Sequence, residues 1–92
     1  MAVTVKLPTQ LREAAGGASE AQVDGATVGE VLEALYGDFD GLRDRITDEG
    51  GGLRRFVNVY VGGEDIRFLS GLETEVSDGD EVTILPAVAG GR

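Results

Sequence analysis

Apolar and polar side chains alternate over residues 3–7, where Val3, Val5 and Leu7 share one face. This period of two is typical of a strand with one buried face. Pro8 follows, and it ends the strand because proline has no backbone N–H to donate to a neighbouring strand. The chain is therefore expected to open with a half-buried strand.

Further along, the apolar spacing changes from two residues to three and four, which predicts a helix with one apolar face. The residues on that face are Val28, Val31, Leu32 and Leu35. Thr27 and Glu30 have the spacing of a capping box, in which each side chain satisfies a free backbone N–H at the helix start. Gly37 is predicted to end the helix as a C′ glycine. A short second helix is expected over residues 40–46, and a helical turn over residues 10–15.

The rest of the chain predicts short strands separated by turns. Residues 56–61 form the strongest of these strands, with Val57, Val59 and Val61 on one face. The other expected elements, in chain order, are a weak strand over residues 20–23, a mobile loop at Gly50–Gly52, a tight turn at Gly62–Gly63, a short return strand over residues 64–68, a turn at Ser77–Asp80 and a closing strand over residues 81–85.

A main helix among four or five strands has to cover one face of their sheet. We therefore predict an α+β fold, with a four- to five-stranded mixed sheet packed on one main helix and a short second helix. With the first and last strands paired in the centre, this order of elements is that of a β-grasp. The pattern indicates one domain over residues 1–86, followed by a flexible tail over residues 87–92.

Composition narrows the classes of function. The 92 residues include no Cys and no His, which argues against a disulfide framework, a cysteine nucleophile, a hydrolase triad and a zinc centre. The balance of 17 acidic against 8 basic residues gives a net charge of −9. That charge argues against nucleic acid as a partner and favours a protein that is basic where it touches this chain. No segment resembles a signal peptide or a membrane span, so we expect a cytoplasmic protein without a membrane partner.

Several short motifs are interpreted as structural. Asp78-Gly79-Asp80 lacks the ligand spacing of a calcium loop and is predicted to be a turn, so no metal site is expected. Gly50–Gly52 is not followed by the Gly-Lys-Ser/Thr of a phosphate-binding loop. Arg54-Arg55 is interpreted as solvated or ion-paired. Phe68-Leu69 is predicted to form a satellite core, with an exposed docking patch as the alternative.

The sequence Gly90-Gly91-Arg92 follows the last predicted strand. One interpretation is an ordinary frayed end of a domain. The other is chemical, because two residues without Cβ can extend through a narrow channel and present an unhindered glycine carboxylate. A partner enzyme would have to activate that carboxylate, since a free carboxylate is a poor acyl donor. Such a protein supplies no catalytic side chain, which agrees with the missing Cys and His.

Segments along most of the chain resemble the ThiS/MoaD family of sulfur carriers and, within it, the CysO-type carriers of cysteine biosynthesis. These segments are Val3–Val5, Pro8–Arg12, the helix after Thr27, Arg55–Val61, Glu64–Phe68 and Asp78–Gly91. The resemblance is most specific near the end, where the Asp-Gly-Asp turn, a strand and Gly-Gly occur in that order. It implies a ubiquitin-like β-grasp, in agreement with the element order.

The resemblance also implies a mechanism in which the chain is a protein cosubstrate and not an enzyme. A ThiF/MoeB-like activating enzyme would use ATP and magnesium to adenylate the carboxylate of Gly91, with Gly90 as its flexible neighbour. Sulfur would then replace the adenylate to leave a thiocarboxylate. A PLP-dependent cysteine synthase holding O-phosphoserine would accept the sulfur, and a zinc-dependent metalloprotease would release the cysteine formed on the carrier. No cofactor is expected on the chain itself.

Arg92 departs from the family pattern, because it joins Gly91 in a peptide bond where the chemistry needs a carboxylate. We expect a metal-dependent peptidase to remove it. Three questions stay open at the level of sequence: the sulfur acceptor, the residues that dock on partners, and the oligomeric state. The acceptor could belong to thiamin, molybdopterin, tRNA or secondary-metabolite pathways. A second class of function is a ubiquitin-like modifier or binding module, in which Gly91 would form isopeptide bonds with lysines.

Overall fold

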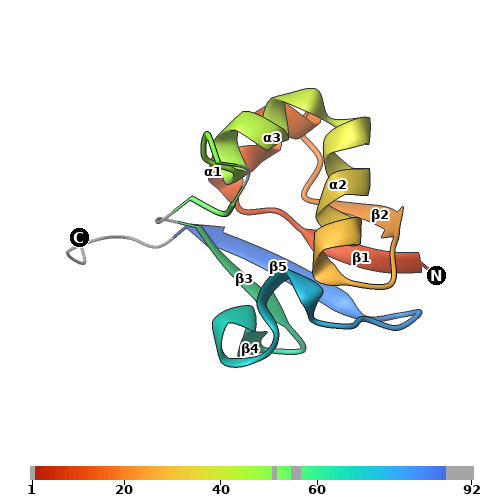
Figure 1. Ribbon diagram of the computed structural model, residues 1–92. Helices are drawn as coiled ribbons and strands as arrows, with labels where there is room; N and C mark the ends of the chain where they lie inside the picture. The colour runs from red at the N-terminus through yellow and green to blue at the C-terminus, as the bar shows by residue number, and fades with distance from the viewer. Residues whose placement is uncertain (1, 51, 55–56, 87–92) are drawn as a thin grey trace.

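The computed structural model of the chain describes residues 2–50, 52–54 and 57–86 (Figure 1). In that part of the chain, five strands form one mixed sheet in the order β2-β1-β5-β3-β4. The strands are β1 (Ala2–Lys6), β2 (Glu20–Asp24), β3 (Val57–Val61), β4 (Glu64–Asp65) and β5 (Glu81–Pro86). The first and last strands lie side by side in parallel, and the other pairings are antiparallel. The predicted β-grasp is therefore confirmed.

The helical elements are α1 (Thr9–Arg12), α2 (Val28–Asp38) and α3 (Asp40–Ile46), with 3-10 turns η1 (Glu13–Ala15), η2 (Ile66–Phe68) and η3 (Gly71–Glu73). The main helix α2 and the shorter α3 lie on one side of the sheet (Figure 1). The predicted second helix over residues 40–46 and the helical segment near residues 10–15 are both confirmed.

The core lies between these helices and the sheet, and it follows from the two periodicities of the sequence. Alternate strand residues point toward the helices, and helix residues spaced by three and four point back. The side chains that are almost completely buried include Val3, Val5, Val59, Val82 and Ile84 from the strands, and Val28, Val31, Leu35, Leu42 and Ile46 from the helices. At the alternate positions of β1, Ala2 and Lys6 are exposed and Thr4 is half-buried, so the predicted half-burial of this strand is also confirmed.

Helix α2 begins as its capping residues predict. The Thr27 hydroxyl accepts a hydrogen bond from the Glu30 N–H at 3.2 Å. The Glu30 carboxylate accepts from the Ala26 N–H at 2.9 Å, one residue earlier than a standard capping box. Both interactions satisfy backbone donors at the start of the helix, and they fix where its apolar face begins.

The prediction that Gly37 ends this helix is wrong. Gly37 is a helical residue, and it is absent from the described glycines that have positive φ. The helix continues through Asp38 and ends at Phe39, which has a φ of −138° and donates its N–H to the Leu35 carbonyl at 2.9 Å. Phe39 packs against the core and α3 starts at the next residue. Tertiary packing therefore sets the end of the helix, and the glycine does not.

The predicted return strand over residues 64–68 is only partly correct. Gly62 and Gly63 have φ of +59° and +91°, as a tight turn after β3 requires. Strand β4 then ends at Asp65, whose carboxylate accepts the Arg67 N–H at 2.8 Å and turns the chain into η2. The first residue of η2, Ile66, is buried in the core.

Candidate functional site

The end of β5 is the part of the fold to which the predicted reactive tail is joined. Strand β5 is central, and it pairs with β3 as far as Pro86, which lies opposite Val57. Its pairing with β1 is shorter and reaches only Thr83, opposite Lys6. Beyond Lys6 the chain turns at Pro8 into α1. One edge of β5 is therefore unpaired just before the tail begins.

A groove of about 380 Å³ lies along this unpaired edge. Its walls come from the end of β1, from α1 and from the last residues of β5: Lys6, Leu7, Pro8, Thr9, Gln10, Arg12, Thr83, Ile84 and Leu85. The Arg12 guanidinium donates to the Leu7 carbonyl at 3.2 Å, which holds α1 over the groove. Lys6 contacts Glu81 at 3.5 Å between Nζ and Oε2. The groove thus combines apolar walls with two basic side chains in an otherwise acidic protein.

The predicted reactive residues Gly90, Gly91 and Arg92 lie outside the described residues, so their roles stay predictions. What the structure adds is the groove at the base of that tail. The sequence pattern alone did not predict it. The one available indication was the segment Pro8–Arg12. It resembles the family although the sequence alone assigns it no role, and it forms a wall of the groove.

Exposed apolar side chains lie on the same molecule, and one of them borders the groove. Leu85 is 43% exposed and is the second-last residue of β5. Phe68 is 84% exposed and Leu69 is 41% exposed, so the prediction that they form a satellite core is wrong. The Arg67 guanidinium donates to the Val57 carbonyl at 3.1 Å, which holds η2 with Phe68 on the solvent side. The alternative, an exposed patch, is what the structure has.

The acidic turn at residues 77–80 is structural, as predicted. The Asp78 carboxylate accepts the Ala2 N–H at 2.8 Å, and the Asp80 carboxylate accepts the Ser77 N–H at 2.7 Å. Gly79 has a φ of +88°. Across the described residues, no group of three or more His, Cys, Asp or Glu side chains could hold a metal ion.

The Gly50–Gly52 segment is tied to a carboxylate where it is described. The N–H groups of Gly50 and Gly52 both donate to Oδ1 of Asp48, at 2.9 and 3.2 Å. Nearby, the Arg54 guanidinium donates to the Asp44 carbonyl at 2.8 Å, while Arg55 lies outside the described residues.

Among the described helices, none has the length and apolar character needed to cross a membrane.

Comparison with known proteins shows which family the chain belongs to. A sequence profile of the ThiS family matches residues 5–91, which includes the groove, β5 and both glycines of the tail. The chain belongs to the ThiS family. It is 50% identical to the sulfur carrier protein CysO of Mycobacterium tuberculosis over 93 aligned residues, covering 99% of this chain and all of the relative.

Solved structures of this family have the same fold. CysO in the BexX/CysO complex of Amycolatopsis orientalis is 50% identical, with a TM-score of 0.88 over 97% of this chain and 99% of that one. The small archaeal modifier protein SAMP1 of Haloferax volcanii is 34% identical, with a TM-score of 0.85 over 99% of this chain and 100% of that one. Both the fold and the family expected from the sequence are thereby confirmed.

Proposed function

We propose that this ThiS-family chain is a sulfur carrier that serves cysteine biosynthesis, with Gly91 as the residue that bears the sulfur. The observation that carries the proposal is the 50% identity to CysO, which extends over the full length of that carrier. The proposal makes the chain a cytoplasmic protein substrate that partner enzymes act on. The absence of Cys and His from the sequence is compatible with this role.

The proposed chemistry has three steps at the end of the chain. Hydrolysis of the Gly91–Arg92 peptide bond by a metal-dependent peptidase first exposes the Gly91 carboxylate. A ThiF/MoeB-like enzyme then uses ATP and magnesium to form the acyl-adenylate, and pyrophosphate leaves. A sulfide-equivalent nucleophile finally attacks the acyl carbon, AMP leaves and a thiocarboxylate remains. Gly90 lacks a Cβ, which allows the tail to enter a narrow active site.

The acceptor in this proposal is O-phosphoserine held by a PLP-dependent cysteine synthase. The thiocarboxylate sulfur replaces the phosphate, which leaves, and the resulting thioester rearranges to a peptide bond between Gly91 and the amine of the new cysteine. A zinc-dependent metalloprotease then cleaves the new cysteine from Gly91 and returns the carrier for another cycle. The chain itself needs no cofactor, since ATP, magnesium and PLP belong to the partner enzymes. The same carrier could also supply thiamin, molybdopterin, tRNA or secondary-metabolite thiolation. Acceptor choice depends on the pocket of the partner enzyme.

The geometry at the end of β5 supports this role. A central strand paired through Pro86 is a rigid base from which a tail can extend toward a partner. Leu85 and the groove beside it offer an apolar surface near that base. The CysO of Amycolatopsis orientalis has been solved in complex with BexX, and this supports binding of a partner protein by a relative with the same fold.

Mass spectrometry of the intact chain tests the proposal. The variant that lacks Arg92 is incubated with a ThiF/MoeB-like enzyme, ATP, magnesium and a sulfide donor. The expected result is the mass gain of one oxygen-to-sulfur exchange. Gly91→Ala in the same background is the matched control and is expected to load poorly while folding normally. Loading of Gly91→Ala at the original rate would overturn the assignment of Gly91.

A second candidate function is protein modification, which the similarity to small archaeal modifier proteins favours. In that case the activated Gly91 would form an isopeptide bond with a lysine amine, and AMP would leave. The two functions give different products after co-expression with an activating enzyme. A branched peptide in which the C-terminal segment of this chain, ending at Gly91, is joined to a target lysine would support modification, while the thiocarboxylate mass supports the carrier.

A further inference from the structure

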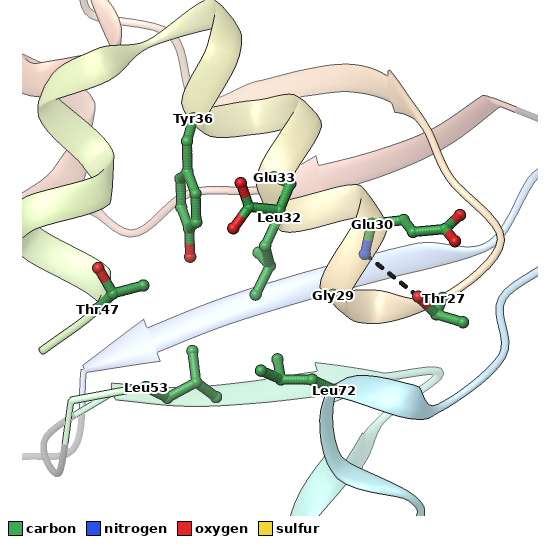
Figure 2. A pocket seen from close by; sticks show the side chains of 9 residues that line it. All are labelled: Thr27, Gly29, Glu30, Leu32, Glu33, Tyr36, Thr47, Leu53 and Leu72. Carbon is green, nitrogen blue, oxygen red and sulfur yellow. Dashed lines mark hydrogen bonds between the residues drawn. The ribbon is translucent and has the colours of Figure 1, made fainter. Parts of the chain in front are cut away.

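A second cavity lies beside α2 and shares no lining residue with the groove at β5. It has a volume of about 310 Å³, within the lower part of the range of roughly 300–1,000 Å³ that small-molecule sites have. Its lining residues come from α2, from the segment between α3 and β3, and from η3 (Figure 2): Thr27, Gly29, Glu30, Leu32, Glu33, Tyr36, Thr47, Leu53 and Leu72.

The walls of this α2 pocket are mainly apolar and are set by packing. Leu32 is 2% exposed, and Leu53 is half-buried against the core. Leu72 closes the opposite side, where η3 approaches the first turn of α2. A Cβ on Gly29 would lie 3.1 Å from the Leu72 carbonyl oxygen, so a glycine at this position permits the close approach.

One polar group in the pocket has no partner. Tyr36 is only 2% exposed, and among the described residues its buried hydroxyl has no hydrogen-bond partner. The hydroxyl points from α2 toward Leu53 (Figure 2), and its oxygen is buried, so the open part of the pocket stops short of it in this structure. The neighbouring Thr47 hydroxyl donates to the Arg43 carbonyl instead. A buried hydroxyl without a partner is destabilising, so its persistence calls for an explanation.

The Tyr36 ring is held by Arg43, which does not line the pocket. The Arg43 guanidinium lies 4.9 Å from the ring centroid. The same guanidinium donates to the Glu33 carboxylate at 3.0 Å. The ordinary pKa of a tyrosine is 10.0, and burial raises that of Tyr36 to about 12, so the hydroxyl is protonated well beyond neutral pH and is available as a donor. The hydroxyl is therefore a preorganised donor at an apolar wall.

The charges at the rim restrict what can bind. Glu30 and Glu33 both line the pocket. Arg43 offsets the charge of Glu33, so the negative charge that disfavours an anionic ligand comes mainly from the Glu30 carboxylate. We propose that the α2 pocket binds an uncharged, mainly apolar small molecule whose acceptor oxygen or nitrogen takes a hydrogen bond from the Tyr36 hydroxyl. The half-buried side chain of Leu53 faces that hydroxyl and moves aside to admit the acceptor.

Nuclear magnetic resonance titration of the full chain tests this site, with acetophenone as the probe. Acetophenone has an apolar ring and one acceptor oxygen. Saturable shifts are expected in the amide signals around Tyr36, Leu53 and Leu72. Benzoate, which is similar in shape but anionic, and ethylbenzene, which lacks an acceptor, should each bind at least about tenfold more weakly.

Two variants separate the hydroxyl from the rest of the fold. Tyr36→Phe should weaken acetophenone binding about tenfold. Tyr60→Phe removes a hydroxyl from β3 outside the pocket and should leave binding unchanged. Without the probe, Tyr36→Phe should melt at the same temperature as the original chain or higher, because it loses only an unpaired group.

Three results would overturn the proposal. The first is a lack of saturable shifts at the pocket. The second is equal binding of acetophenone by Tyr36→Phe. The third is a clear drop in the melting temperature of Tyr36→Phe, because it would mean that the hydroxyl already has a partner in the free protein.

Discussion

At the scale of single residues, Tyr36 links a buried side chain to the pH dependence of stability. Burial is the main reason that its pKa rises from 10.0 to about 12, with the Glu33 carboxylate adding to the rise and the Arg43 guanidinium opposing it. Between these two values the unfolded chain releases the tyrosine proton and the folded chain retains it. The free energy of unfolding should therefore fall by about 1.4 kcal/mol per pH unit in this window, with no loss below pH 10.

Urea unfolding at several pH values between 8 and 12 measures this effect. Tyr36→Phe cannot titrate at this position, so the difference in unfolding free energy between the two chains isolates the contribution of Tyr36. The difference should stay constant up to about pH 10 and then shift in favour of the variant. Parallel curves for the two proteins through pH 12 would contradict a raised pKa.

Leu85 is the residue whose exposure is most directly connected with the tail. It is 43% exposed one residue before Pro86, and it lines the groove beside β5. If the proposed activating enzyme docks at this groove, Leu85→Ser should speed its dissociation roughly tenfold, because an apolar contact at the centre of an interface contributes about 1–2 kcal/mol. Surface plasmon resonance measures the rate, and the matched control is Leu69→Ser, which changes an exposed leucine away from the groove. Equal effects of the two substitutions would argue against docking at the groove.

At the scale of elements, the end of α2 offers a test of what terminates a helix. Gly37 is exposed, lies inside the helix and has open space where a Cβ would be. Gly37→Ala should raise the free energy of unfolding by about 0.5–1 kcal/mol, because alanine loses less backbone entropy in a helix than glycine. Thermal or urea unfolding measures this gain. A loss of stability would contradict this expectation and would indicate that Gly37 ends the helix as a left-handed cap.

Gly25→Ala is the matched substitution with the opposite expectation. A Cβ at Gly25 would lie 2.7 Å from the Val31 backbone nitrogen and 2.8 Å from its Cγ2. The first of these atoms belongs to the helix backbone, so α2 itself would have to shift. We expect this variant to lose about 1–3 kcal/mol, as overpacked cores do.

The elements that the sequence predicted well are those with a strong period. Alternation along β1 and the three- and four-residue spacing of α2 follow directly from which side chains are buried. The end of α2 and the short β4 could not be predicted in this way. In both places a residue further along the chain, Phe39 or Ile66, packs into the core and redirects the backbone. Local propensity has no information about that packing.

The candidate site likewise has one part that the sequence could predict and one part that it could not. Gly90 and Gly91 could be proposed from the sequence, because the proposed chemistry depends on residue type and order alone. The groove beside β5 could not be predicted, since it exists because the pairing of β1 with β5 stops at Lys6 and Thr83. Register between strands distant in sequence is a property of the assembled sheet. The exposure of Phe68 likewise depends on the bond from Arg67 to Val57, which joins two separate elements.

At the scale of the whole molecule, the net charge of −9 should act on how fast a partner is found. Opposite charges on two proteins accelerate encounter, and salt screens them over a distance that falls from about 30 Å at 0.01 M to about 8 Å at 0.15 M. The association rate with the proposed activating enzyme should therefore fall as salt increases, while the dissociation rate changes little. Stopped-flow fluorescence across this range of salt measures both rates.

Glu49→Lys makes an exposed position away from the groove basic, so it should slow association at low salt and converge with the original chain at high salt. An association rate that does not depend on salt would mean that the acidic surface does not guide the partner.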